Sequence, residues 1–143
     1  MRLFILSLLA AVLLTISPVQ GRPLASCGDV ITESTVLTQD LVCPGSEYAI
    51  VMGAPNITLD LGEHLLQGDS TNIGVFSNGF EGLTIQNGVI ENFSRGIFLA
   101  NTPDVIVQDL TVRNLEVTDP NNFIFGVAIN DSQDVTVRNM LFE

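Results

Sequence analysis

The stretch Gly96–Asn114, GIFLANTPDVIVQDLTVRN, decides the fold of this chain, because its pattern of apolar and polar residues recurs. Similar units open at Tyr48, Gly74 and Gly126, and in each unit the next apolar run starts eight positions after the opening. The openings are 26, 22 and 30 residues apart (48 to 74, 74 to 96 and 96 to 126). This spacing predicts a structural repeat of about 22 residues that is lengthened in places by inserted residues.

Apolar residues alternate within each run, which is the pattern of a β-strand with one buried face. Aligned on their openings, the repeats stack aliphatic residues into four columns, namely Ala49, Val75, Ile97 and Val127; Val51, Ser77, Leu99 and Ile129; Ile57, Leu83, Val105 and Val135; and Leu59, Ile85, Val107 and Val137. Columns of this kind, with three short strands per turn, predict an all-β parallel β-helix (solenoid) of about five coils. An antiparallel sandwich would need hairpin turns between adjacent runs, whereas Asn78-Gly79 and Asn87-Gly88 fall at matching corners of the repeat.

Two insertions account for the unequal spacings. We expect about four extra residues near 66–73, and about eight near 116–123, where Asp-Pro-Asn-Asn at 119–122 is typical of a turn. Polar residues stack at the corners, with Asn87, Asp109 and Asn139 at one corner and Asn92 and Asn114 at another. Asn and Asp tolerate the unusual backbone angles of tight bends, so these columns indicate structural ladders.

Residues 1–21 read as a signal peptide, with Arg2 before an apolar run over 3–16 and Ser17-Pro18 after it. An uncleaved membrane anchor is the alternative, although the run is short for a membrane span. A lipoprotein is a third interpretation, because Leu24-Ala25-Ser26-Cys27 resembles a lipobox. Export predicts a secreted protein, extracellular or periplasmic, that contacts no membrane beyond the signal peptide.

Cys27 and Cys43 are the two cysteines of the chain, and a disulfide between them is the default in an oxidising compartment. Two ligands alone are too few for a zinc site. We therefore expect residues 22–47 to form an N-terminal cap segment, stapled by this disulfide, ahead of the repeats at 48–143. Solenoids need such caps because the first repeat would otherwise leave a strand edge and a core face bare.

The composition excludes some partners. An apolar fraction of 46% is sufficient for a core, and sixteen acidic residues against five arginines give a net charge of −11. This charge argues against nucleic acid, whose phosphates require Lys or Arg contacts. It also disfavours polyanions such as pectate or alginate, unless a divalent cation bridges the two.

The repeat pattern resembles the right-handed parallel β-helix proteins of the pectate-lyase-like superfamily, which consist of short parallel β-helix repeats. The likeness rests on Gly96-Ile97-x-Leu99 followed by Asp104-Val105-x-Val107-x-Asp109. Cys27-Gly28-Asp29, the segment 40–43 and the segment 57–61 look like the opening of a secreted subgroup of unassigned role. Gly62-Glu63-His64 departs from the Asn-Gly-His of that subgroup. The resemblance implies a superfamily with polysaccharide lyases, glycoside hydrolases and alginate epimerases, alongside adhesins and periplasmic binding factors.

Lyases of this superfamily use an Arg or Lys base with calcium held by carboxylates. The candidates are Arg95, Arg113 and Arg138, with Asp104, Asp109, Asp131 and Asp134. A calcium site at Asp104, Asp131 and Asp134 is one hypothesis, because Asp104 and Asp134 would stack on successive coils. The simpler interpretation is that these residues cap turns through backbone N–H groups.

Other catalytic patterns are missing, including the paired acids of polygalacturonases, epimerase-like Asp-Pro-His clusters and Gly-x-Ser-x-Gly. The single histidine, His64, lies at a predicted corner, and we expect it to stabilise the turn rather than act as a base. No catalytic residue is assigned.

Two further features concern the surface. Asn56, Asn92 and Asn130 match the N-glycosylation pattern, which has meaning only in a eukaryotic secretory pathway. Met140-Leu141-Phe142 would leave an apolar terminal coil, so we expect a continuation of the chain or self-association to cover it.

The sequence therefore predicts a secreted β-helix module that binds carbohydrate or an extracellular surface without catalysis of its own and without a required cofactor. The alternative is that the chain is the N-terminal part of a polysaccharide lyase or epimerase that acts on uronate-containing polymers.

Overall fold

The structure, a computed structural model, describes residues 22–23, 26–115 and 125–143, so the predicted signal peptide at 1–21 lies outside the described residues. Across the described part the elements are all strands, and none of it forms a helix long and apolar enough to cross a membrane. The strands are β1 (Arg22–Pro23), β2 (Asp29–Ile31), β3 (Thr35–Val36), β4 (Leu41–Val42), β5 (Tyr48–Met52), β6 (Thr58–Asp60), β7 (Leu65–Gln67), β8 (Ile73–Asn78), β9 (Thr84–Glu91), β10 (Arg95–Ala100), β11 (Val105–Arg113), β12 (Phe125–Asn130) and β13 (Val135–Phe142).

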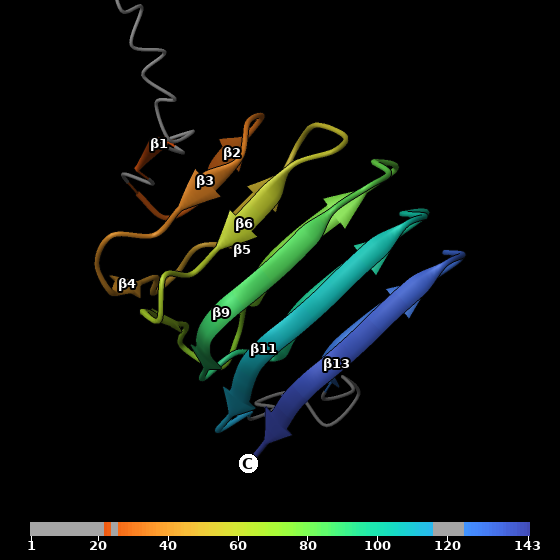
Figure 1. Ribbon diagram of the computed structural model, residues 1–143. Helices are drawn as coiled ribbons and strands as arrows, with labels where there is room; N and C mark the ends of the chain where they lie inside the picture. Colours follow the sequence, from red (N-terminus) through yellow and green to blue (C-terminus); the bar gives the residue numbers. More distant parts are fainter. Residues whose placement is uncertain (1–21, 24–25, 116–124) are drawn as a thin grey trace, which may run out of the picture.

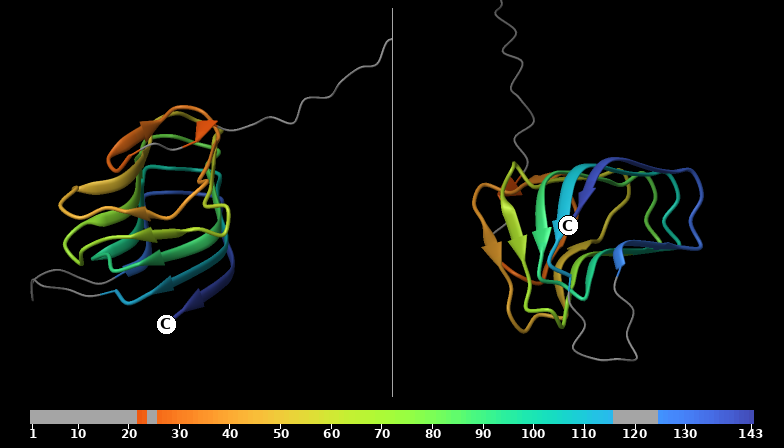
Figure 2. Two further views of the ribbon diagram at one scale, coloured as in Figure 1. Left: turned by 90° about the vertical axis from the view of Figure 1, so that its left-hand side faces the viewer. Right: turned by 90° about the horizontal axis from the view of Figure 1, so that it is seen from below.

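The strands wind into a parallel solenoid with two sheets (Figures 1 and 2). An eight-stranded sheet follows the order β1-β3-β6-β9-β11-β13, with β4 and β7 paired beside this path, and a five-stranded sheet follows β12-β10-β8-β5-β2. The prediction of an all-β parallel β-helix is confirmed. The stack amounts to about three complete turns, and the expected five coils also count the short cap winding and the winding of β12 and β13.

The core is a set of aliphatic columns between the sheets. Leu59, Ile85 and Val107 lie in register on successive turns, and each of them is fully buried. Complete burial of such a side chain stabilises the fold by about 1.5–3 kcal/mol relative to leaving it exposed. Val137 continues the column in the last described winding, where its side chain is 45% exposed. The apolar columns predicted for the second run are therefore confirmed.

The second and third strands of the later turns merge into one bent strand. β9, β11 and β13 each pass through a corner residue with a positive φ, which is 59° at Asn87, 54° at Asp109 and 51° at Asn139. Side-chain contacts connect the corners, since Asn139 Nδ2 donates to Asp109 Oδ1 over 2.9 Å. The second predicted corner column is also left-handed, with φ of 57° at Asn92 and 49° at Asn114. Three separate strands per turn occur only in the first windings.

The register predicted for the first repeat is wrong by one residue. Ile50, and not Ala49, pairs with Val75, and Val51 pairs with the outward-facing Phe76. Further along the same turn Leu59 pairs with Ile85, as predicted. The connection between β5 and β6 is thus one residue shorter than the connection between β8 and β9.

Met52, rather than Val51, is therefore the core residue beside Ser77, whose Oγ donates to the Met52 carbonyl oxygen over 3.1 Å.

Close backbone packing between turns explains why the later repeats open with glycine. A Cβ added to Gly74 would lie 2.4 Å from the carbonyl oxygen of Gly96, and one added to Gly96 would lie 2.6 Å from that of Gly126. Real Cβ atoms do not approach backbone that closely, so the next turn of the chain occupies the space of a side chain at these positions.

The insertion of four residues predicted near 66–73 is in fact divided between two corners. Asp60 pairs with Gln86, 26 positions on, Leu65 with Val89, 24 positions on, and Ile73 with Arg95, 22 positions on. Two extra residues therefore precede β7 and two follow it. The two insertions lengthen the corners and leave the strands in register.

The larger insertion is consistent with the registers on either side of it. Glu91 pairs with Arg113, 22 positions on, and Arg95 pairs with Phe125, 30 positions on. Eight additional residues thus fall between Arg113 and Phe125, and the segment 116–124 lies outside the described residues.

The N-terminal segment forms a winding of its own. β2, β3 and β4 pair in parallel with β5, β6 and β7. The predicted disulfide is present, with the Cα atoms of Cys27 and Cys43 5.4 Å apart and Cys43 fully buried. At the opposite end of the stack, Leu141 and Phe142 are 51% and 55% exposed. Their coverage by further chain or by a second copy stays a prediction.

Candidate functional site

The outer face of the eight-stranded sheet carries a column of polar side chains that are bonded to one another. Asp60, Gln86, Gln108 and Arg138 stack on successive turns. Gln86 Nε2 donates to Asp60 Oδ2 over 2.9 Å, Gln108 Nε2 donates to Gln86 Oε1 over 2.8 Å, and Arg138 Nε donates to Gln108 Oε1 over 2.8 Å. This ladder is a structural feature that holds consecutive turns together.

The outer face of the five-stranded sheet is different in kind. It carries the outward side chains of β5, β8, β10 and β12, which we call the aromatic face, formed by Tyr48, Ile73, Phe76, Arg95, Phe98, Phe125 and Ala128. The four strands contain no Asp or Glu, although the chain has sixteen. A surface rich in aromatic residues, on strands without acidic residues, is a candidate for binding on so acidic a protein. Glu47, the residue before Tyr48, lines a cavity beside Arg95 and is the acidic group next to this surface.

Aromatic rings stack along this face. The ring centroids of Tyr48 and Phe76 are 4.4 Å apart, and those of Phe76 and Phe98 are 5.9 Å apart. Parallel strands repeat about every 4.8 Å, so outward residues in register bring their rings within stacking distance. The guanidinium carbon of Arg95 lies 5.2 Å from the centroid of Phe98, a cation–π contact that holds a positive charge on the face.

Two shallow cavities flank Arg95. The first, of about 360 Å³, is lined by Arg95, Phe98, Phe125 and residues 127–130. The second, of about 350 Å³, is lined by residues 45–47, 71–73, Ser94 and Arg95. Both volumes lie at the lower end of the range for small-molecule sites. The first cavity has the mostly apolar lining with a few polar groups that is typical of such sites, whereas most residues that line the second are polar. The arrangement suits a compact ligand with an apolar surface and a polar rim.

Sequence reasoning missed this face, although the pattern contains a signal for it. The repeat motif Gly96-Ile97-x-Leu99 leaves one position unspecified, and that position is Phe98. Phe76 is its partner in the preceding turn. Alternation along a strand makes these positions outward-facing, so two aromatic residues at outward positions of consecutive repeats predict a ring column.

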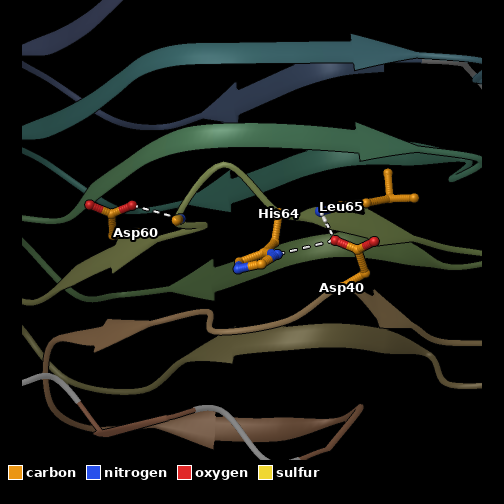
Figure 3. A network of polar contacts seen from close by, with 5 residues as sticks. Asp40, Asp60, His64 and Leu65 are labelled. Carbon is orange, nitrogen blue, oxygen red and sulfur yellow. Dashed lines mark hydrogen bonds and ion pairs between the residues drawn. The ribbon is translucent and has the colours of Figure 1, made fainter.

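The corner at His64 is a polar junction between two windings (Figure 3). Asp40 Oδ1 lies 3.2 Å from His64 Nδ1 and accepts the Leu65 N–H over 3.0 Å. The Leu65 N–H, and then the His64 side chain, lower the pKa of Asp40 below its ordinary value of 3.8. Beside it, Asp60 Oδ1 accepts the Gly62 N–H over 2.8 Å. These bonds hold the turn that contains two extra residues, which agrees with the turn-stabilising role expected for His64.

The three residues of the calcium hypothesis lie at bends. Asp104, Asp131 and Asp134 have φ of 55°, 50° and 54°, and the Asp104 N–H donates to the Gln133 carbonyl oxygen over 3.0 Å. Among the residues that the structure describes, no three His, Cys, Asp or Glu side chains are grouped so that they could hold a metal ion. The calcium site stays a prediction without support from this geometry.

The arginines proposed for a lyase are on different surfaces. Arg113 Nε contacts Glu91 Oε2 over 2.7 Å on the eight-stranded sheet, where Arg138 also lies, whereas Arg95 is on the aromatic face. Asp109, a candidate calcium ligand, is at a corner and accepts Asn139 Nδ2. The structure therefore does not bring these residues into one cluster.

The predicted glycosylation positions are reachable to different degrees. Asn56 and Asn130 are exposed, and Asn92 is half-buried. Asn130 also lines the cavity beside Phe98, so a glycan attached there would compete with any ligand of that cavity. Glycosylation itself stays a prediction.

Comparison with models of known families, with curated proteins and with solved structures finds no match to this chain. The fold and the surface together define a parallel β-solenoid with one polar and one aromatic outer face.

Proposed function

We propose that this protein is a secreted β-solenoid module that binds carbohydrate through its aromatic face, without catalysis of its own. The observation that carries the proposal is the column of rings formed by Tyr48, Phe76 and Phe98 on strands that contain no acidic residue. On the other outer face, the central column of polar groups is bonded within itself.

The chemistry of a sugar fits this surface. A pyranose ring carries C–H groups on its faces and hydroxyls around its rim, so it is apolar in one direction and polar in another. Aromatic side chains bury large apolar areas, and a small number of polar groups such as Arg95 and Asn130 supply orientation. The net charge of −11 repels anionic polymers, so the proposal is for neutral glycans.

Export supports an extracellular ligand. The disulfide between Cys27 and Cys43 is of the kind that persists in oxidising compartments, and the segment at 1–21 has the pattern of a signal peptide.

The test is titration calorimetry of the full chain, exported so that the disulfide forms, against neutral hexasaccharides of glucose, mannose and xylose. We expect at least one of them to bind, and Phe76→Ala to weaken its binding at least tenfold. The matched control is Ile106→Ala, which removes an aliphatic side chain 37% exposed on the polar outer face and leaves the affinity unchanged.

Two results contradict the proposal. One is the absence of binding to every neutral hexasaccharide. The other is the release of unsaturated product from hexagalacturonate in the presence of calcium, which would favour the lyase alternative.

A further inference from the structure

We propose that the cavity beside Phe98 is a subsite for a single neutral pyranose ring, which takes the place that an aromatic side chain holds in the two preceding turns. This inference rests on the proposed function and specifies where on the aromatic face the sugar is held.

A gap in the ring column is the first observation. Phe76, Phe98 and Ala128 are in register on successive turns. The first two carry rings, whereas Ala128 carries only a methyl group. A cavity of about 360 Å³ lies where the column would continue, lined by Phe98 on one turn and by Ala128 on the next.

The other end of the ring column, at Tyr48 and Val51, is arranged differently. Val51 is the small residue in register with Phe76 there, and the ring of Tyr48 from the same strand stacks on Phe76 at 4.4 Å. Phe125 has the same place in its strand as Tyr48 has in β5, since both are in the column of Ile73 and Arg95. Phe125 is 43% exposed and forms a wall of the cavity. The space beside Phe76 thus holds the Tyr48 ring, whereas the space beside Phe98 is the cavity.

The lining matches a sugar ring in polarity. Phe98, Phe125 and the Ala128 methyl group supply apolar walls for the C–H groups. Arg95 supplies N–H donors, and Asn130 supplies an amide that can both donate and accept. The cation–π contact with Phe98 fixes the guanidinium on this surface. A flat hydrocarbon ring would offer no hydrogen-bonding group to the Asn130 amide, which is why we assign a pyranose.

The volume limits the ligand. At about 360 Å³ the cavity lies at the lower end of the range for small-molecule sites, which suits one sugar residue rather than a segment of chain. The remainder of a glycan would extend over the neighbouring aromatic face.

The decisive variant is Ala128→Phe, which continues the ring column and fills the cavity with the protein's own side chain. With the neutral hexasaccharide that binds the wild-type protein most tightly, calorimetry is expected to show at least a tenfold loss of affinity. The matched control is Val30→Phe, which adds the same ring to the cap winding. Val30 pairs with Val51 on the same column and is 59% exposed. We expect this variant to bind within twofold of the wild-type protein.

A second measurement does not depend on the folding of the variant. In the wild-type protein, intermolecular nuclear Overhauser effects should connect sugar-ring protons to the Ala128 methyl group and to the Phe98 ring protons. Their presence supports the subsite, and their absence in a saturated complex contradicts it.

The outcomes separate the two proposals. If a hexasaccharide binds and a folded Ala128→Phe retains wild-type affinity, the subsite is wrong and the proposed function stands. If no neutral hexasaccharide binds, both fall. If phenol binds the cavity and competes with no sugar, the site takes aromatic rings, and the assignment to a pyranose is wrong.

Discussion

Tyr48 and Phe76 stack on successive turns of the solenoid, with an angle of 27° between their ring planes. Tyr48 is opposite Ile73 and not opposite Phe76, so its side chain leans along the strand, across Val51, to reach the ring of the next turn. The Arg95 side chain also extends along its strand, and its guanidinium lies over the ring of Phe98 in the same strand. The aromatic face therefore packs as one layer, in which each turn supports the rings of its neighbour.

Removal of the central ring should destabilise the protein. We expect Phe76→Ala to lower the free energy of unfolding by about 1–2 kcal/mol, less than the ~3–5 kcal/mol of a fully buried Phe, because this ring is half-buried. Urea denaturation measures the change. Tyr48 is the only tyrosine and the chain has no tryptophan, so near-ultraviolet circular dichroism reports on the stack itself. Ile106→Ala serves as the control, and an equal loss of stability in both variants would contradict the layer.

The left-handed corner at Asp109 gives a prediction about the backbone. Asp109→Gly and Asp109→Ala both remove the bond from Asn139, so they differ chiefly in the tolerance of a φ of 54°. Because a Cβ disfavours this region, the glycine variant should be the more stable of the two by about 1 kcal/mol. Thermal unfolding ranks the pair, and an alanine variant at least as stable as the glycine variant would show that the corner is not strained in this way.

The disulfide between Cys27 and Cys43 should contribute about 3 kcal/mol, the value for a closed loop of about this length. We expect Cys27→Ala/Cys43→Ala to lower the urea midpoint accordingly, because the unfolded chain gains freedom. Reductant should lower the stability of the wild-type protein toward that of the double variant and should not affect the variant itself. Unchanged stability on reduction would mean that strand pairing alone holds the cap winding.

Asp40 makes stability depend on pH in the acid range. Its pKa is lowered from 3.8, first by the Leu65 N–H and then by His64. A carboxylate with a depressed pKa contributes stability above its unfolded pKa, and this contribution is lost as the pH falls through the folded value. The stability advantage of the wild-type protein over Asp40→Asn should therefore narrow below about pH 4.

Titration of the Asp40 carboxyl carbon by NMR checks the cause directly. In His64→Ala the pKa should stay below 3.8, because the larger contribution, from the Leu65 N–H, remains. A carboxyl that titrates at or above 3.8 in the wild-type protein would contradict the assignment.

The fold was predictable because its signal is redundant. Each full turn places an aliphatic residue at the same position, as Leu59, Ile85 and Val107 do. One turn of a different length therefore does not obscure the pattern. Ala49 was placed in the wrong column because the connection between β5 and β6 is one residue shorter than its counterpart in the next turn. An alignment of the sequence without gaps does not reveal this difference. The two corner insertions around β7 were merged for the same reason, since only strand pairing shows where extra residues leave the column.

The candidate site was less predictable, because an outward position has no fixed identity. Phe76 and Phe98 occupy the unspecified position of the repeat motif, whose specified positions form the core. A prediction based on the specified positions therefore does not identify them. The cavity is lined by Ala128 and Phe125, and neither a small outward residue nor the placement of a ring is visible as a sequence motif. The Asp residues that looked conspicuous are at bends, where their backbone conformation accounts for them.

Since each winding adds one residue to every column, the length of the aromatic face is counted in whole windings. Val75 and Ile97 are 22 positions apart and in register, so a segment of this length is one complete winding. Duplication of such a segment would add one position to the ring column and one to the polar ladder. With glycan binding as proposed, a change in the number of windings would alter the length of glycan that the aromatic face can hold, while the width of the face stays constant. Under the proposed function, the length of the bound glycan and the length of the molecule are therefore coupled, and either could be engineered through the other.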